Sequence, residues 1–320
     1  MAELWEHRRG YTFLRAYTGW FTRLSYRHLR LRGEKLPADG AVLLAPNHTN
    51  TLMDALVMLE VQNDTVVFGA RADIFRKPAI GRILHFLRIV PMVRQRDGLE
   101  HVSENYETFD RIDQVLERRI PFCLFPEGTH RPQRNLQPIK KGVVRIALKS
   151  ALSRQTWLVP TGINYTDFFR YRGACEVRYG PAINVNAFVR EHEGLSDAQL
   201  LQALRAHLEQ QMARLVEPEG PAPDIPSHLL LLLWPFAALL SLPIWAVAET
   251  LCRKVRDKAW CNTIRCMTHL LLLPLTLLLW GIVFGLTLPW YATLSLLTAT
   301  LSALPVFYDG LNLLRSFKKT

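Results

Sequence analysis

Three long, uncharged, apolar stretches occupy the last third of the chain and limit what it can fold into. Residues 228–248, 269–288 and 289–308 contain no Lys, Arg, Asp or Glu. Each has the length, about 20 residues, that an α-helix needs to cross the hydrocarbon core of a bilayer. We therefore expect residues 228–320 to form a membrane region with two to three hydrophobic helices.

Basic residues border these stretches and predict their orientation. They lie between the first two stretches and after the third: Arg253, Lys254, Arg256, Lys258, Arg265, Arg315, Lys318 and Lys319. The positive-inside rule assigns both basic segments to the cytoplasm, so the second and third stretches form a hairpin. The first stretch contains Pro235 and Pro243. Either it dips into the membrane and returns, which keeps the preceding residues cytoplasmic, or it spans the membrane and places them on the opposite side.

The N-terminal residues 1–32 are predicted to form an amphipathic helix. Over residues 11–32, aromatic and apolar side chains recur every three or four positions, with arginines between them. Such a helix suits a membrane interface, where its arginines reach lipid headgroups. The pattern is equally typical of an ordinary amphipathic helix packed on the domain.

Residues 33–215 alternate short apolar runs with helical patterns. Strands are predicted at 41–46, 66–70, 89–93, 122–125, 157–163 and 176–179, and helices at 51–61, 78–87, 102–118, 143–152 and 196–215. This alternation predicts an α/β fold with a mixed, largely parallel sheet flanked by helices. The proline-rich residues 216–227 are predicted to link this domain to the membrane region.

Polar residues follow three of the predicted strands. His48, Arg94 and Glu127 each come directly after, or close to, the end of an apolar run. Ligands of open parallel sheets gather at the carboxyl ends of the strands. We therefore expect these three side chains to face one cleft.

His48 and Asp54 allow two interpretations. Thr51 to Asp54 fits the [ST]-x-x-[DE] capping box of a helix N-terminus, in which Asp54 has only a structural role. In the alternative, His48 is a general base and Asp54 fixes its tautomer. A helix N-terminus can bring the aspartate back to a histidine on the preceding loop, so the spacing permits both.

Two other segments are candidates for binding a phosphate. Residues 125–129 have the sequence FPEGT and precede the pair Lys140-Lys141, where another helix begins. Gly128 lets the backbone approach an anion closely, and helix N-terminal amides favour phosphate; a plain turn is the alternative. Arg94 suits two-pronged phosphate binding, or it is an ordinary solvated arginine.

Charge and cysteine content exclude some classes of function. The net charge of +11 predicts a polyanionic partner: nucleic acid, an anionic membrane surface or a phosphorylated substrate. The basic residues flank apolar stretches or lie in the polar blocks, and no nucleic-acid motif is present, which argues against nucleic acid. The five cysteines are scattered without a Cys-x-x-Cys pair, which argues against a zinc site or a disulfide framework.

Taken in order, four blocks resemble the membrane-bound glycerolipid acyltransferase family, which includes glycerol-3-phosphate and 1-acylglycerol-3-phosphate acyltransferases. The blocks are Asn47-His48 with Asp54, the strand that leads to Arg94, Phe125 to Thr129 with the later Lys141-Gly142, and the Val159-Pro160 strand. The resemblance covers about residues 33–215.

Two departures from the usual family pattern point to one branch of it. Most members have four residues between histidine and aspartate and an arginine after Glu-Gly-Thr. This chain has five residues, 49–53, between them and His130 after Thr129. Both features resemble the branch that includes the fungal glycerol-3-phosphate/dihydroxyacetone-phosphate acyltransferases, which also carries an apolar C-terminal region.

The resemblance implies a role for each matched residue. His48 would be the general base on the acceptor hydroxyl, and Asp54 would orient it. The residues implied in substrate binding are Arg94, Glu127, Gly128, Thr129, Arg131, Lys140, Lys141 and Pro160. Among these, Arg94 would bind the acceptor's phosphate and Pro160 would help to shape the acyl channel.

The resemblance also implies the reaction. A membrane-bound O-acyltransferase would move a fatty acyl group from acyl-CoA or acyl-carrier protein to glycerol-3-phosphate or 1-acylglycerol-3-phosphate, in phospholipid biosynthesis. The catalytic domain, 33–215, would face the cytoplasm and contact membrane lipids, with no metal or cofactor and no nucleic acid. An acyltransferase for another lysolipid and a non-catalytic basic membrane-docking protein are the alternatives.

Overall fold

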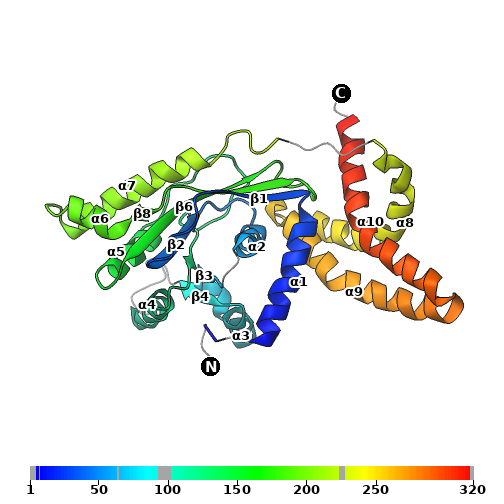
Figure 1. Cartoon of the computed structure of the whole chain (residues 1–320), viewed down its shortest axis with the longest axis horizontal. Helices are drawn as coiled ribbons and strands as arrows, with labels where there is room; N and C mark the ends of the chain where they lie inside the picture. The colour runs from blue at the N-terminus through cyan, green and yellow to red at the C-terminus, as the bar shows by residue number, and fades with distance from the viewer. Residues whose placement is uncertain (1–4, 7, 63–64, 93–101, 223–227, 318–320) are drawn as a thin grey trace.

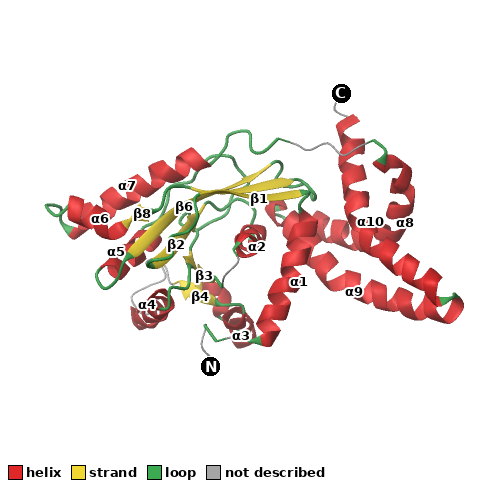
Figure 2. Ribbon diagram, viewed as in Figure 1, coloured by secondary structure: helices red, strands yellow, loops and turns green. Residues whose placement is uncertain are grey.

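The computed structural model describes residues 5–6, 8–62, 65–92, 102–222 and 228–317. An α/β domain occupies one side of the molecule and three long helices project from the other (Figures 1 and 2). After α7 (Asp197–Leu215), residues 216–222 run along the top of the view in Figure 1, and α8 (Leu230–Lys254) is the first of the three long helices.

One mixed sheet forms the centre of the domain, with the strand order β1-β7-β6-β2-β5-β3-β4 and β8 paired to β6. The strands are β1 (His28–Gly33), β2 (Ala41–Pro46), β3 (Val67–Arg71), β4 (Ile89–Met92), β5 (Phe122–Cys123), β6 (Thr156–Tyr165), β7 (Ala174–Tyr179) and β8 (Ile183–Asn184). Strands β6, β2, β5, β3 and β4 are parallel, whereas β7 and β8 pair antiparallel to β6. The predicted mixed, largely parallel sheet is confirmed.

Helices cover both faces of the sheet. The remaining helices of the domain are α1 (Arg9–Ser25), α2 (Leu52–Val61), α3 (Pro78–Phe86), α4 (Val102–Glu117), α5 (Gly142–Ala151) and α6 (Val185–Glu191). Alternate residues of β2 point to opposite faces, as strand geometry requires. Val42 and Leu44 join a core with α1, α2 and the C-terminal helices, and Leu43 joins one with α4, α5 and α7.

The N-terminal helix is shorter than the sequence pattern predicts. Helix α1 ends at Ser25, and residues 28–33, expected to be helical up to 32, form the edge strand β1. In HLRLR, apolar and basic residues alternate, which is the period of a strand. Strand β1 pairs in parallel with β7, and Arg32 forms an ion pair of 2.9 Å with Glu176 of that strand. The arginines of 28–32 therefore belong to a sheet edge.

Helix α1 packs on the membrane region as well as on the domain. Tyr17 donates a hydrogen bond of 2.5 Å to the carbonyl of Leu270, and Phe21 is buried in the same core as α2 and the C-terminal helices. Phe13 and Trp20 remain exposed on the same helix. The helix thus has both a packed face and an apolar exposed face.

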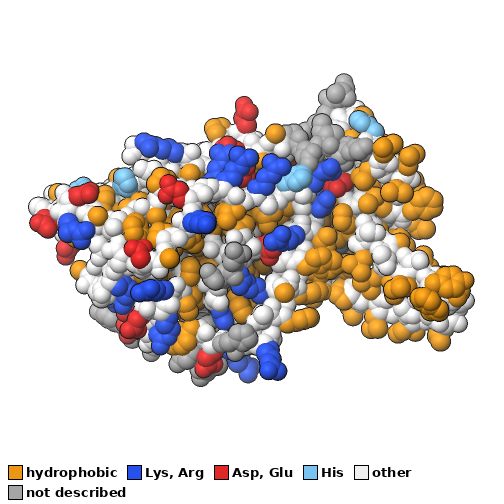
Figure 3. Space-filling model, in the orientation of Figure 1, with side chains coloured by type: hydrophobic (Ala, Val, Ile, Leu, Met, Phe, Trp, Pro, Cys, Tyr) orange, Lys and Arg blue, Asp and Glu red, His pale blue; other side chains and the backbone are white. Residues whose placement is uncertain are grey.

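The three apolar stretches form the long helices α8, α9 (Cys261–Thr287) and α10 (Trp290–Phe317). Each is long and apolar enough to cross a membrane. Apolar side chains gather over these helices in Figure 3, while most Lys and Arg side chains in that view lie over the α/β domain. Hydrogen bonds from the start of α9 and ion pairs of Asp309 on α10 tie these two helices to the domain.

Candidate active site

His48 and Asp54 lie side by side at the carboxyl end of β2. The strand ends at Pro46, a turn follows, and α2 begins at Leu52, so Asp54 falls in the first helical turn. His48 Nδ1 is 2.8 Å from Asp54 Oδ2. Thr51 adopts a positive φ of 51° in this turn, a conformation that a non-glycine residue rarely takes. Local strain at this residue accompanies the contact between the histidine and the aspartate.

Asp54 is fully buried and surrounded by hydrogen-bond donors. Besides His48, its Oδ2 accepts hydrogen bonds from the backbone amides of Thr49 (2.8 Å) and Asn50 (2.7 Å), and its Oδ1 accepts one from the hydroxyl of Tyr165 (2.6 Å). A buried carboxylate requires such compensation for the water it has lost. The four donors together fix its position.

The capping box allowed by the sequence is not formed. The Thr51 side chain makes no capping hydrogen bond to the start of α2. Its hydroxyl instead lies 2.8 Å from the hydroxyl of Thr263, on α9. Asp54 therefore organises the turn that carries His48, and Thr51 links that turn to the membrane region.

These contacts define the chemistry that His48 can perform. Since the Asp54 carboxylate accepts hydrogen bonds, His48 Nδ1 carries the proton and Nε2 of the neutral ring has a free lone pair. The ring stacks on Phe125, with centroids 4.3 Å apart and planes inclined by 25°. Asp54 thus fixes one edge of the imidazole ring and Phe125 fixes one face. Nε2, on the other edge, is suited to accept a proton.

Glu127 lies behind the histidine loop, and its exposed fraction is only 2%. Its Oε1 accepts a hydrogen bond from the backbone amide of His48 (3.3 Å), and its Oε2 accepts one from Gln137 Nε2 (2.5 Å). Burial raises the pKa of this carboxyl to about 7, although the hydrogen bonds from His48 and Gln137 oppose the rise. Both oxygens face protein donors, so the geometry favours support of the His48 loop over direct contact with substrate.

The segment after Glu127 continues along the same loop. Gly128 has a positive φ of 69°, which glycine adopts at little cost. The amide of Arg131 donates to the carbonyl of His48 (3.1 Å), and the amide of Lys140 donates to the carbonyl of Pro126 (2.7 Å). The basic side chains of Arg131, Lys140 and Lys141 are exposed. The loop therefore brings positive charge to the side of the molecule that holds His48.

The remaining predicted site residues are Thr129, Pro160 and Arg94, and they do not share one environment. Thr129 is exposed, and its carbonyl accepts a hydrogen bond from Gln137 (3.2 Å). Pro160 is buried in β6, in register with Ala45 of β2, so it lies inside the sheet close to the start of the His48 turn. Arg94 lies outside the described residues.

Four partners of the site were given no role in it by the sequence. Tyr165 ends β6, the neighbour of β2, so the rule that sites form at strand ends could have identified it. Gln137 lies in a loop with no motif of its own. His130 entered only as a departure from a family pattern, yet its ring lies 5.6 Å from that of His48 and its Nε2 is 2.8 Å from Asp257 Oδ2. Asp257 is distant in sequence, and no local pattern connects it to the site.

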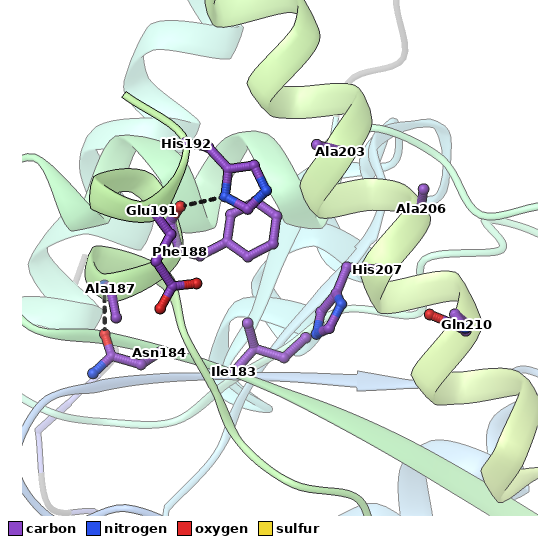
Figure 4. Close-up of a pocket in the computed structure, with 10 residues that line it drawn as sticks. All are labelled: Ile183, Asn184, Ala187, Phe188, Glu191, His192, Ala203, Ala206, His207 and Gln210. Carbon is purple, nitrogen blue, oxygen red and sulfur yellow. Dashed lines mark hydrogen bonds between the residues drawn. The ribbon is translucent and has the colours of Figure 1, made fainter. Parts of the chain in front are cut away.

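A cavity of about 740 Å³ lies between α6 and α7, away from this cluster (Figure 4). The histidine rings that line the cavity contact neighbouring groups. His192 and His207 both pack on Phe188, and His192 Nδ1 lies 2.8 Å from the Phe188 carbonyl oxygen. It contains none of the predicted site residues. Within the described part of the chain, no group of three His, Cys, Asp or Glu residues is placed to hold a metal ion.

Comparison with known proteins identifies the domain. Residues 28–164 match the acyltransferase family. These residues form an acyltransferase-family domain. The match runs from β1 almost to the end of β6 and contains every site residue predicted from the sequence.

The chain is also similar to two known acyltransferases. The chain is 25% identical over 158 residues to 1-acyl-sn-glycerol-3-phosphate acyltransferase alpha of Mus musculus, an alignment that covers 46% of this chain. It spans about half, 52%, of the length of that protein. It is also similar to the crystal structure of PlsC, the 1-acyl-sn-glycerophosphate (LPA) acyltransferase of Thermotoga maritima. That likeness has a TM-score of 0.45 and 18% identity and covers 66% of this chain and 83% of that chain.

Proposed function

We propose that this acyltransferase-family protein transfers a fatty acyl group from an acyl thioester, acyl-CoA or acyl-carrier protein, to the hydroxyl of a glycerophosphate. The observation that carries the proposal is the His48–Asp54 pair. A histidine held on one nitrogen by a buried carboxylate is the arrangement that a general base for a hydroxyl requires. The family match supports acyl transfer as the reaction that uses this base.

In the proposed reaction, His48 Nε2 takes the proton of the acceptor hydroxyl while the hydroxyl oxygen attacks the thioester carbonyl carbon. The C–S bond then breaks, and the leaving thiolate takes the proton back from the imidazolium. The products are an ester and a free thiol, so atoms and charge balance. Asp54 compensates the positive charge that His48 carries between the two proton transfers.

A phosphorylated acceptor suits the surroundings of His48. Arg131, Lys140 and Lys141 supply exposed positive charge on the loop whose backbone holds His48. Glycerol-3-phosphate and 1-acylglycerol-3-phosphate both carry the required phosphate, and Arg94 is proposed as a further ligand for it. The five residues between His48 and Asp54, together with His130, support the branch that acts on glycerol-3-phosphate or dihydroxyacetone phosphate.

The test is an activity assay on membranes that contain the full-length protein. Radiolabelled acyl-CoA is supplied with glycerol-3-phosphate, dihydroxyacetone phosphate or 1-acylglycerol-3-phosphate, and the lipid products are resolved; the series is repeated with acyl-carrier protein. We expect one acceptor to give product and His48→Ala to lower its rate by about 10²–10⁴-fold. His192→Ala, which removes a histidine from the α6–α7 cavity, is the matched control and should keep full activity. Equal rates in His48→Ala and the wild type would refute the mechanism.

The helices α8–α10 are proposed to enter the membrane from the same side as the catalytic domain, without crossing it. The end of α8 is near the domain, because Asp257 in the turn after this helix lies 2.8 Å from His130. On α10, Asp309 pairs with Arg172 (2.9 Å) and Arg27 (3.4 Å) of the domain. These ion pairs hold the C-terminal part of α10 against the domain.

The free length of the α9–α10 hairpin supports the same arrangement. Leu273 is the last buried residue of α9, so residues 274–287 project beyond the domain. A helix of this length, about 14 residues, extends about 21 Å, less than the hydrocarbon core of about 30 Å. In intact cells, a membrane-impermeant maleimide should not label Leu288→Cys at the tip of the hairpin. Labelling from outside the cell would instead show that the hairpin spans the membrane.

A further inference from the structure

A second histidine–carboxylate pair lies beside the first. The ring of His130 meets that of His48 edge to face, with centroids 5.6 Å apart and planes inclined by 73°. Its Nε2 is 2.8 Å from Oδ2 of Asp257, which belongs to the turn between α8 and α9. A residue of the membrane region therefore holds a side chain that touches the proposed general base.

The turn that carries Asp257 is internally fixed. Asp257 Oδ1 accepts a hydrogen bond from the amide of Ala259 (3.0 Å), which leaves Oδ2 for His130. Lys258 Nζ donates to the carbonyls of Cys252 (2.9 Å) and Val255 (3.1 Å) at the end of α8. One oxygen of the Asp257 carboxylate is thus fixed by its own turn, and the other faces His130.

The start of α9 also docks on the domain, which sets the distance between the turn and the site. Asn262 Nδ2 donates to the carbonyl of Phe168 (2.8 Å), and Arg265 donates to the carbonyl of Phe169 (2.6 Å). The hydroxyl of Thr263 contacts that of Thr51, in the turn between His48 and Asp54. Trp260 packs edge to face against His130, with centroids 5.9 Å apart. The turn between α8 and α9 therefore lies against the site.

The chemistry of His130 follows from its partner. With Nε2 engaged by Asp257, Nδ1 is the remaining polar atom of the ring, and it has no hydrogen-bond partner among the described residues. The hydrogen bond from His130 lowers the pKa of the Asp257 carboxyl, so the carboxylate is charged at neutral pH. A charged carboxylate on one nitrogen compensates the positive charge of the ring when the other nitrogen donates to an anion. The exposed Arg131 next to it in the chain adds to the positive charge there.

We propose that Asp257 is a positioning residue of the active site: it holds His130 so that His130 binds the phosphate of the acceptor while His48 deprotonates the acceptor hydroxyl. The inference rests on the proposed function, because it assigns a binding role to residues beside the proposed base. It adds that the membrane region, and not only the family domain, determines the affinity for the acceptor.

The experiment is steady-state kinetics on the full-length protein in nanodiscs of phosphatidylcholine and phosphatidylglycerol, with acceptor and acyl donor varied separately. The acceptor is the one that gives product with the wild type. Asp257→Asn keeps an oxygen for the Ala259 amide but removes the charge. We expect it to raise the acceptor KM about 5–10-fold and to leave kcat and the donor KM within about twofold.

A double-mutant cycle separates positioning from a general structural effect. His130→Gln should raise the acceptor KM by a similar factor, and adding Asp257→Asn to it should raise the KM no further, because both changes remove the same interaction. Asp257→Glu should recover part of the lost affinity. Asp113→Asn, which removes a carboxylate paired with Arg154 elsewhere in the domain, is the control and should match the wild type.

The outcomes distinguish this inference from the proposed function. Wild-type transfer that depends on His48, with an unchanged acceptor KM in Asp257→Asn, would overturn the inference alone. Multiplicative effects in the double variant would also overturn it, since they would show that the two residues act separately. Absence of transfer by the wild type with every acceptor and donor would overturn the proposed function and, with it, the role of Asp257.

Discussion

The two His–Asp pairs of the site differ in their separation along the chain and in their burial. His48 and Asp54 are six residues apart, and Asp54 is fully buried with donors on both oxygens. His130 and Asp257 are 127 residues apart, and the Asp257 side chain is 50% exposed. The first pair is built by one turn and one helix, whereas the second exists only because α9 docks on the domain. We infer that the first pair performs the chemistry and the second adjusts binding.

The largest difference between the pairs is expected on removal of the aspartate charge. In Asp54→Asn, the side-chain NH₂ group faces the N–H groups whose hydrogen bonds the carboxylate accepts in the wild type. The tautomer of His48 is then no longer fixed. We expect kcat to fall by about 10²–10⁴-fold. The free energy of unfolding should also decrease by about 1–3 kcal/mol, because a buried donor loses its acceptor. Kinetics and thermal unfolding in detergent measure the two effects.

Asp257→Asn provides the contrast, with an effect of about 5–10-fold on the acceptor KM alone. A loss of kcat in Asp257→Asn as large as that in Asp54→Asn would erase the distinction between a chemical pair and a binding pair.

An intermediate effect is expected at Glu127, which holds the backbone of His48 and lies three residues before His130. Its pKa is about 7 in the folded protein, against 4.5 for an ordinary glutamate. The unfolded chain therefore binds fewer protons between these pH values, so folding stability decreases as pH rises from about 4.5 to 7. The decrease from this group is about 3 kcal/mol at most.

The Glu127→Gln variant tests this assignment, because it cannot titrate. We expect the melting temperature of the wild type in detergent to fall, relative to that of the variant, between pH 5 and pH 8. Melting temperatures that change in parallel across this range would show that Glu127 does not have the raised pKa.

The smallest effect is expected where the two pairs are connected. Thr263→Val removes the hydroxyl that contacts Thr51 and leaves a buried hydroxyl without its partner. We expect a loss of stability of about 1 kcal/mol and a rise in acceptor KM of about threefold or less, with kcat unchanged. The control is Thr300→Val on α10, whose hydroxyl donates to the carbonyl of Leu296 in its own helix and to no other group among the described residues. Identical kinetics in both variants would show that the turn is held without this contact.

The fold was largely predictable because its elements depend on local patterns. The apolar runs of residues 41–46 and 157–163 and the helical pattern of residues 51–61 agree with β2, β6 and α2 to within a few residues. Residues 28–32 were wrongly predicted to be helical, because arginines and apolar residues at this spacing suit a helix as well as a strand. Pairing with β7, an interaction remote in sequence, decides between the two.

The sequence by itself determined the three long apolar helices and the largely parallel sheet, because each follows from residues close together in the chain. It placed Asp54 within reach of His48, but the contact between the two side chains was decided by the structure. Only the tertiary structure decided the contacts of Asp54 with Tyr165, of Glu127 with Gln137 and of His130 with Asp257. These contacts join segments that have no common periodicity. Their formation depends on how the helices pack on the sheet and on the need of each buried carboxylate for donors, which no local pattern records.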